Sequence, residues 1–466
     1  MINNIKNKIL NSLAFRNGLL CIIGYIFNKA IAFFMIPILS RIILISDYGI
    51  INTYTSWLSI LSCIIGLGME YSIRNAYVDF KDKFEEYITS VCEISLINLF
   101  FCGNIIFIIN KFILNQENDL ICILCIIHSY VYVVINYFNN KYTMEKKYSK
   151  RLLLLIIPNL LSSILGIILI LRFQENKYMG RIWGYVLVFI PVGVFLIINQ
   201  IRKNKNIFCL KKYWRYSLKI SLPMIFHGLS NVVLSSSDRI IINKFLGSLE
   251  TGIYSLFYNC SLIIIGIIVA IENIWIPWFT KQMVEKKYNI INEKVVIYIK
   301  IVLTLIIIIL MTSPEIIDII ATTKYSRGKF LLTPLIISGF FIFLYSLSIG
   351  VELFYKKNKY IALNTILAAI LNIIFDIIFI PIYGLKAAAY VTLISYIFLF
   401  IVHYRNSRKL NKIIFPIRNY ISPIFILMIN CFLFEVFINV WFIRWSICIL
   451  FVNLLVFQIL KKESNL

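Results

Sequence analysis

The sequence predicts an all-α protein that crosses a membrane with about fourteen helices. Two observations support this fold class. Of the 466 residues, 60% are hydrophobic and only 15% are charged, whereas a soluble protein of this length needs more polar surface. The apolar residues also fall in blocks of about 20, the length that spans roughly 30 Å of hydrocarbon. The connections are too short to hold a catalytic domain, so we do not expect an enzyme.

Each expected helix is one apolar block that ends where charged or turn-forming residues begin. The block after Arg16 is long and lacks a small-residue cleavage site, which indicates a retained helix rather than a signal peptide. Cys122 and Cys125 lie inside the apolar run ICILCII without further ligands nearby, so neither a metal nor a cofactor is expected. The expected segments are 17–41, 50–72, 87–110, 119–139, 152–171, 181–200, 216–240, 253–276, 296–318, 331–354, 360–381, 384–403, 420–440 and 444–460.

Lysine and arginine concentrate in alternate connections, such as 202–219 and 405–418. This alternation places those connections and both termini in the cytoplasm. Basic cytoplasmic loops next to anionic lipid also explain the net charge of +24, so no nucleic acid is needed as a partner. The richness in Ile, Asn and Lys is typical of AT-biased bacterial genomes, which points to a bacterial cytoplasmic membrane.

A weak internal repeat relates the first two expected helices to the seventh and eighth. Arg41 matches Arg239, and Glu70 matches Glu272 to within one residue of spacing. Parallel repeats of this kind are typical of alternating-access carriers. We therefore expect a bundle of six helices at 1–205, a second bundle of six at 206–410, and two additional helices at 411–466.

Several expected helices carry polar residues on one face, at spacings of three and four. Such faces surround a water-filled lumen or mediate plain helix packing. The number of polar faces, together with the charges below, favours a lumen. Its expected polar lining is Asn52, Ser56, Ser59, His227, Asn231, Ser235 and Asn372.

Charges within the apolar blocks differ in depth. Lys29 lies in mid-membrane and Arg41 and Arg239 lie toward the outer ends of their helices, a cationic zone that suits phosphate oxygens. Carboxylates in a partly dry lumen carry protons or bind sodium. The expected carboxylates are Glu70, Glu93, Asp238, Glu272 and Asp376.

Simpler ion pairs remain as alternatives for some of these charges. Glu70 and Glu93 pair with Lys29 or Arg74 in that interpretation. Asp238 and Arg239 then form a pair at the membrane boundary, next to lipid headgroups.

The order of several stretches resembles the polysaccharide (O-antigen or capsule) flippases of the multidrug/oligosaccharidyl-lipid/polysaccharide exporter superfamily. The matching stretches are LSRIILISDYGIINTY with GLGMEYSIRNA, YSLKISLPMIF with SSSDRIIINKFLG and TGIYSLFYN, and LNIIFDIIFIPIYGLKAAAYVTLISY after the Lys-rich YKKNKY. Each stretch is degenerate, but their order and spacing cover nearly the whole chain.

This resemblance implies a two-bundle carrier that moves a polyprenyl-diphosphate-linked oligosaccharide from the cytoplasmic to the outer leaflet. The lumen cations that match the family's headgroup site are Lys29, Arg41, Arg74 and Arg239. Asp376 departs from the family, which commonly has an amide there. H⁺ or Na⁺ is the implied coupling ion, and a polysaccharide polymerase is a further expected partner.

Three other functions remain open. A multidrug antiporter of the same superfamily tends to have an acidic and aromatic lumen, unlike the cationic one expected here. A flippase for a lipid-linked peptidoglycan precursor has the same helix count and a similar lumen. A membrane glycan polymerase or glycosyltransferase needs a catalytic loop on the outer face, which the short connections do not provide.

Overall fold

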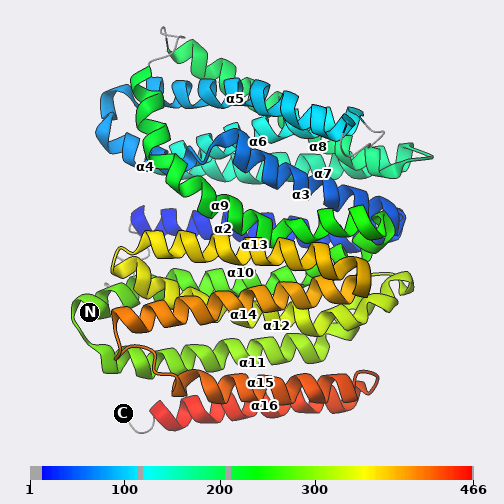
Figure 1. The fold of residues 1–466 in the computed structure, drawn as a ribbon, viewed down its shortest axis with the longest axis vertical. Coiled ribbons are helices and arrows are strands. Elements are labelled where there is room, and N and C mark those ends of the chain that lie inside the picture. The colour runs from blue at the N-terminus through cyan, green and yellow to red at the C-terminus, as the bar shows by residue number, and fades with distance from the viewer. Residues whose placement is uncertain (1–12, 113–118, 205–210, 464–466) are drawn as a thin grey trace. The chain divides into compact units, whose positions relative to one another are not determined.

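The computed structural model describes residues 13–112, 119–204 and 211–463, and every element in these ranges is a helix (Figure 1). The chain divides into two compact units, residues 1–243 and 244–466. Each of the fourteen expected segments coincides with helix. The predicted fold class is therefore confirmed, with one difference in the second segment.

The first unit is built around one central helix. Helix α6 packs against α3, α4, α5, α7 and α8, and α2 packs on α7. Apolar side chains of α3, α5, α6 and α8 form the core, which includes Ile65, Val91, Val134 and Ile182. The elements are α2 (Leu13–Ile42), α3 (Ile45–Gly66), α4 (Glu70–Asp79), η1 (Lys81–Lys83), α5 (Phe84–Phe112), α6 (Asp119–Met144), α7 (Tyr148–Arg172), α8 (Lys177–Lys203) and most of α9 (Lys211–Leu246).

The second unit is centred on α12, which packs against α10, α11, α13 and α14. The last two helices, α15 and α16, pack on α11, and Figure 1 shows them side by side next to it. Arg444 of α16 is 2% exposed and binds both carboxylate oxygens of Glu315 and the Met311 carbonyl, both on α11. The elements are α10 (Ser248–Val284), α11 (Tyr288–Ile320), η2 (Thr323–Leu331), α12 (Leu332–Phe354), α13 (Asn358–Tyr383), α14 (Leu385–Leu410), α15 (Arg418–Val436) and α16 (Trp441–Glu463).

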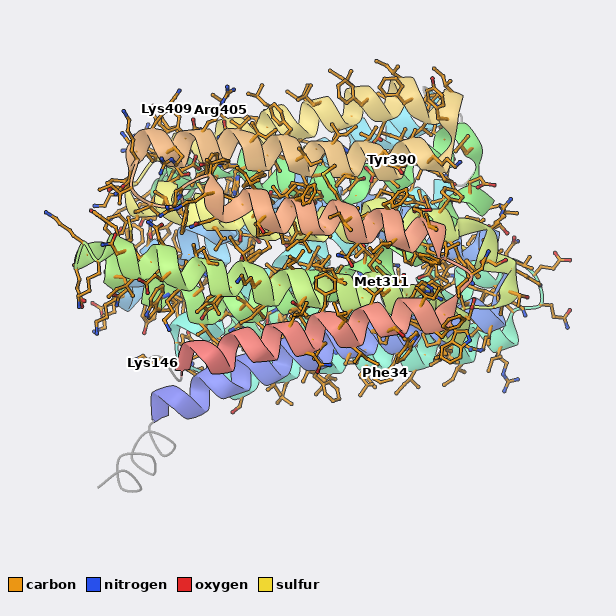
Figure 2. All side chains as sticks on the ribbon, turned by 90° about the horizontal axis from the view of Figure 1, so that it is seen from below. Phe34, Lys146, Met311, Tyr390, Arg405 and Lys409 are labelled. Atoms are coloured by element: carbon orange, nitrogen blue, oxygen red, sulfur yellow. The ribbon has the colours of Figure 1, made fainter. Side chains whose placement is uncertain are left out.

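The described residues contain 12 helical segments that are long and apolar enough to cross a membrane. Large apolar side chains point outward along them, such as Phe100 of α5, which is 64% exposed. Figure 2 shows Arg405 and Lys409 at one end of α14 and Tyr390 nearer its other end. A helix with charges at its end and exposed apolar side chains along its length is covered by hydrocarbon. The protein is a multi-pass membrane protein.

The expected helix 50–72 is broken, which corrects the prediction of a single helix. Helix α3 ends at Gly66, and α4 begins at Glu70. Between them, Leu67 and Gly68 have φ of +49° and +61°, a left-handed conformation that ends a helix and that glycine adopts without steric cost. The 35 residues of Ile45–Asp79 therefore cross the membrane as a discontinuous segment.

Three connections share one turn. Lys146, Lys286 and Lys356 each lie two residues after a helix end, with φ of +57°, +56° and +57°. In each turn, the amide of the next residue donates to the carbonyl five positions earlier, at 2.8, 3.0 and 2.9 Å. This is the hydrogen-bond pattern of a Schellman motif, which usually has glycine at the left-handed position. Lysine at all three positions is contrary to that preference.

Two of these turns also share an ion pair. Lys147 donates to Glu145 at 2.7 Å, and this hydrogen bond raises the pKa of the lysine. Lys287 donates to Glu285 at 2.6 Å, and the same contact lowers the pKa of that carboxyl. The sequence EKKY at both positions thus encodes one local structure.

The division of the structure does not coincide with the expected one. The boundary between the two units falls near the end of α9, at Asn243, rather than before that helix. The three parts 1–205, 206–410 and 411–466 stay a prediction.

Candidate functional site

The break between α3 and α4 holds an acidic side chain inside the first unit. Glu70 is the first residue of α4 and is only partly exposed. Cys63, Tyr71 and Tyr132 lie close enough to its carboxylate to interact electrostatically. Within the part of the chain that the structure describes, Arg74 forms no ion pair with Glu70, although it lies one turn further along α4. Discontinuous helices of this kind often form the binding sites of carriers.

The backbone carbonyls freed by the break are satisfied by two neighbouring helices. Asn98 Nδ2 of α5 donates to the Ile64 and Ile65 carbonyls at 2.9 and 3.0 Å. The Tyr137 hydroxyl of α6 donates to the Gly66 carbonyl at 2.8 Å. Two turn hydrogen bonds add to these contacts, from the Leu67 amide to the Ile64 carbonyl at 3.2 Å and from the Met69 amide to the Gly66 carbonyl at 3.0 Å. Because each unsatisfied group in hydrocarbon costs several kcal/mol, the side chains and the turn together make the break tolerable.

Helix α9 lies close to the break at two glycines, Gly68 in the break itself and Gly228 on α9. A Cβ atom on Gly68 would lie 3.3 Å from the Ile225 Cα, and one on Gly228 would lie 3.0 Å from the Tyr71 hydroxyl. Larger residues at these positions would separate α9 from α4. Helix α9, whose expected polar stripe consists of His227, Asn231 and Ser235, is therefore held against the break.

The stripe on α9 is partly open and partly buried. Asn231 is exposed, and its Nδ2 lies 3.3 Å from His227 Nε2. Ser235 Oγ donates to the Asn231 carbonyl at 3.1 Å. At the far end of the helix, Asp238 and Arg239 are 1% and 8% exposed.

The stripe on α3 lies mainly inside the first unit. Asn52 and Ser56 are 7% and 1% exposed, and Asn52 donates to the Tyr48 carbonyl at 2.8 Å. Ser59 is half-buried and donates to the Thr55 carbonyl at 2.9 Å. Helix packing explains the first two positions at least as well as a lumen does.

The four expected headgroup cations differ in their exposure. Lys29 and Arg41 of α2 and Arg74 of α4 are exposed, and Arg41 Nη1 donates to the Pro37 carbonyl at 2.8 Å. Arg239 is buried instead. Of the remaining acids in the first unit, Glu93 of α5 is half-buried beside Tyr130 of α6.

The second unit buries its polar stripe almost completely. Asn364, Asn372 and Asp376 of α13 are 4%, 0% and 0% exposed, and α13 packs on α14. Thr392 of α14 is 1% exposed and lies 3.2 Å from the Tyr254 hydroxyl. The carboxylate of Asp376 therefore lies in a polar seam inside the unit.

Glu272 is the second expected acid of this unit. It is half-buried on α10 and interacts electrostatically with Tyr345 of α12. Its matching position in the first unit, Glu70, is likewise half-buried and also lies near tyrosines.

With this geometry established, similarity to known proteins decides the family. The profile of the family described as "Polysaccharide biosynthesis protein" matches residues 14–283, more than half of the 466 residues. The chain belongs to the polysaccharide biosynthesis protein family. The expected resemblance is thereby confirmed.

Individual relatives of this family member agree. The Lsg locus protein 1 of Haemophilus influenzae is 21% identical over 366 residues, which are 77% of this chain and 89% of the relative. The structure of the lipid II flippase MurJ in an inward closed conformation superimposes with a TM-score of 0.74 at 16% identity, covering 95% of this chain and 99% of that one. An inward-facing multidrug resistance transporter of the MATE family and MOP superfamily gives 0.57 at 15% identity, covering 84% and 96%. At these identities the structures establish a shared fold.

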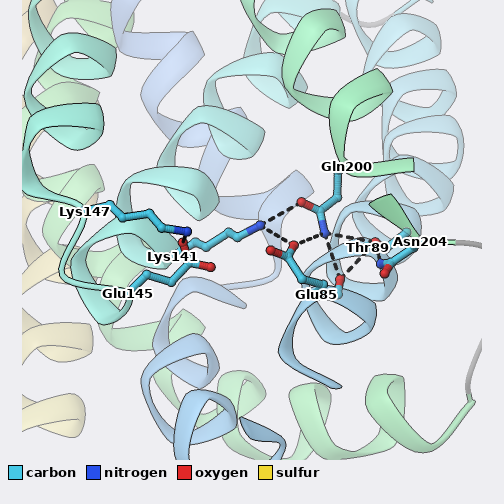
Figure 3. Close-up of polar contacts among 7 residues, drawn as sticks. All are labelled: Glu85, Thr89, Lys141, Glu145, Lys147, Gln200 and Asn204. Carbon is cyan, nitrogen blue, oxygen red and sulfur yellow. Dashed lines mark hydrogen bonds and ion pairs between the residues drawn. The ribbon is translucent and has the colours of Figure 1, made fainter. Parts of the chain in front are cut away.

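The polysaccharide biosynthesis protein also has a charged network that the sequence analysis missed (Figure 3). Lys141 of α6 is 1% exposed, pairs with Glu85 of α5 and donates to Gln200 Oε1 of α8 at 2.9 Å. Gln200 Nε2 donates to the Glu85 carboxylate at 2.8 Å, and Asn204 donates to Thr89. The network ties three helices together near their ends, because α6 continues past the expected end at 139 and draws Lys141 inside.

A second missed cation is Arg181 of α8, which is 4% exposed against α7. Its guanidinium donates to the Ser162 carbonyl at 2.8 Å and the Tyr185 hydroxyl at 2.9 Å. A Cβ on Gly166 would lie 2.9 Å from Arg181 Nη1, so that glycine makes room for the side chain. Arg181 is the first residue of the expected segment 181–200, where cations ordinarily lie at the membrane surface.

A third missed group lies in the second unit. His403 Nδ1 of α14 and Glu352 Oε2 of α12 are 2.8 Å apart, and both side chains are 0% exposed. Neither His403 nor Glu352 is among the expected site residues. Glu352 is an acid in an apolar segment, which is the signal in the sequence. Its partner lies 51 positions further along the chain, so the sequence pattern does not reveal the pair.

Proposed function

We propose that this protein is a flippase for surface polysaccharide biosynthesis, such as that of O-antigen or capsule. It moves a polyprenyl-diphosphate-linked oligosaccharide from the cytoplasmic to the outer leaflet by ion-coupled alternating access. The observation that carries the proposal is the family match over residues 14–283. The fold shared with MurJ over 95% of the chain supports it.

In this proposal the diphosphate headgroup enters a lumen while the polyprenyl tail stays in lipid. Lys29, Arg41, Arg74 and Arg239 receive the phosphate oxygens, because guanidinium and ammonium groups form strong charge-assisted hydrogen bonds with phosphate. The exposure of the first three leaves them accessible to a ligand. The partly exposed polar residues of α3 and α9, Ser59 and Asn231 among them, line the path of the sugar, whereas Asn372 lies inside the second unit.

Ion coupling in this proposal rests on buried acids. A carboxylate within a membrane helix is costly unless it faces a partner or binds an ion, and Asp376 is 0% exposed beside Asn372. H⁺ or Na⁺ binding there would change the charge of the seam between α13 and α14. Glu70, Glu93, Asp238 and Glu272 are the other acids assigned to coupling.

The proposed orientation follows the positive-inside rule. Both termini lie in the cytoplasm of a bacterium, and the protein resides in the cytoplasmic membrane. The lysine-rich turns at Lys146, Lys286 and Lys356 then face the cytoplasm.

A deletion strain tests this function. Polyprenyl-linked oligosaccharides are extracted, and their accessibility to an impermeant sugar-modifying reagent is compared in spheroplasts. Intact lipid-linked oligosaccharide should accumulate on the cytoplasmic face and clear on re-expression. Normal delivery to the outer leaflet, in a strain without a second flippase, would contradict the proposal.

Charge reversal tests the headgroup site in the same strain. Arg74→Glu should abolish complementation, because it replaces a phosphate-binding cation by a repelling carboxylate. Lys81→Glu is the matched control, since Lys81 is equally exposed on η1 but has no assigned role. Equal export by the two variants would remove Arg74 from the site.

The fold shared with MurJ and with a MATE transporter favours two other candidate functions. If the chain flips a peptidoglycan precursor, its deletion should leave that precursor on the cytoplasmic face while the oligosaccharide lipid is delivered. If it is a multidrug antiporter, the deletion should raise drug sensitivity and leave both lipids normal.

A further inference from the structure

The buried pair of Glu352 and His403 belongs to no site described so far. It joins α12 and α14, the two helices at the centre of the second unit, and both side chains are fully enclosed. Glu352 is also tied to the end of α12, because its carbonyl accepts the Lys357 amide at 2.9 Å and closes the turn into α13. A change of charge at this pair therefore acts where three helices meet.

The pair differs by one unit of buried charge between its two protonation states. With a neutral imidazole donating from Nδ1 to the carboxylate, the site carries one negative charge. With one more proton, it becomes an imidazolium–carboxylate pair with no net charge. Enclosed charge is costly, and histidine is the side chain that ordinarily changes its charge between about pH 5 and pH 8.

Both partners have a second polar atom that remains available. Among the residues that the structure describes, Glu352 Oε1 and His403 Nε2 have no hydrogen-bond partner, although both are buried. The same is true of Ser348 Oγ, one turn before Glu352 on the same face of α12. Buried polar atoms without partners are uncommon and call for an explanation, such as a functional role or a bound water or ion.

Within the described ranges, no further ionisable side chain forms an ion pair with Glu352 or His403. Tyr345 of α12 stacks on His403 with centroids 5.9 Å apart and on Tyr396 of α14 at 6.2 Å. On α10, Glu272 and Tyr258 interact with Tyr345. The ionisable residues near the starts of the other two neighbouring helices are Tyr288, Glu293, Lys294, Tyr298 and Lys300 in the first four turns of α11, and Lys359 and Tyr360 in the first turn of α13.

We propose that Glu352 and His403 form a proton-binding site that takes up and releases one proton in each transport cycle. This inference rests on the proposed ion-coupled flippase and names both the ion and a site for it. Proton uptake completes the ion pair and tightens α12 against α14. Proton release leaves one buried negative charge and loosens that contact.

Direct titration tests the site without any substrate. The chain has only three histidines, so purified protein with ¹⁵N-labelled histidine gives three ring spectra, which single His→Asn variants assign. The His403 ring should gain and lose one proton in the course of the titration, and Glu352→Gln should shift that transition. A His403 ring that keeps one protonation state throughout the titration overturns the proposal.

Transport in proteoliposomes tests the coupling. The probe is the oligosaccharide lipid extracted from the deletion strain, and its arrival in the opposite leaflet is followed with an impermeant sugar-modifying reagent. An imposed proton gradient should accelerate the wild type, whereas Glu352→Gln and His403→Asn should still move lipid but lose the acceleration. Acceleration that persists in both variants overturns the proposal.

A matched control separates coupling from packing. His128→Asn changes a histidine that is equally buried, at 1% exposure, but is bonded to the Tyr54 hydroxyl instead of a carboxylate. It should lower thermal stability and keep the acceleration; loss of the acceleration in this variant too would assign the effect to packing and overturn the proposal. A wild type that moves no lipid contradicts the proposed function, and the histidine titration still decides the proton site.

Discussion

Replacing the left-handed lysine of each repeated turn by glycine should stabilise the protein. Lys146, Lys286 and Lys356 have φ near +57°, where an L side chain costs about 1 kcal/mol and glycine costs little. Part of this stabilisation is lost, because glycine has more conformational freedom in the unfolded chain. The expected net gain is about 0.5–1 kcal/mol per turn, or about 2 kcal/mol for the triple variant, because the three turns share no hydrogen bonds.

The next residue in each turn provides a control with the opposite sign. Lys147, Lys287 and Lys357 have φ of −90°, −83° and −90°, so glycine relieves no strain there. Lys147→Gly also removes the contact with Glu145. These variants should lose about 0.5–1 kcal/mol each.

Thermal unfolding of the purified protein in detergent, followed by tryptophan fluorescence, measures both sets. The first set should unfold at higher temperature than the wild type, and the second at lower temperature. If Lys146→Gly and Lys147→Gly lower the midpoint equally, side-chain contacts rather than backbone conformation govern these turns, and the reasoning is refuted.

Three further substitutions should destabilise the protein in the same assay. Lys141→Met should lower the free energy of unfolding by about 3 kcal/mol, because it leaves Glu85 without its cation, and adding Glu85→Gln should recover part of this loss. A double variant that is no more stable than Lys141→Met would contradict this. Tyr137→Phe should cost about 1–3 kcal/mol, because it removes the hydroxyl that bonds the Gly66 carbonyl and the buried Ser95 hydroxyl, and a wild-type midpoint would mean that the break needs no such support. Arg444→Met should cost about 3 kcal/mol, the lower end of the usual range because Glu315 is 32% exposed; an unchanged midpoint in the presence of Glu315 would show that the pair adds nothing.

Apolar block length was sufficient to predict the helices but not their interruptions. Every block of about 20 apolar residues became a helix, because the hydrocarbon leaves the backbone no other way to satisfy its polar groups. The break at Leu67 and Gly68 depends on side chains of α5 and α6, namely Asn98 and Tyr137, that lie far away in the sequence. The local sequence pattern does not reveal such contacts.

The charged residues show the same limit. Lys141 and Arg181 lie at ends of apolar blocks, where charge statistics place cations at the membrane surface. Both are enclosed instead, because α6 continues beyond its apolar block and Gly166 leaves space against α7. The polar stripe of α13 could be recognised from spacing alone, since one helix contains all of it.

The contact between Arg444 and Glu315 has a consequence for how the chain is made. Its partners are 129 residues apart, so at about 5–20 residues per second the ribosome needs roughly 6–26 s to produce Arg444 after Glu315. During that interval α11 has reached the bilayer with a carboxylate whose cation does not yet exist. Glu315 must remain hydrated or bound by the insertion machinery until the final helix arrives. A nascent chain truncated before α16 would retain this carboxylate without its cation.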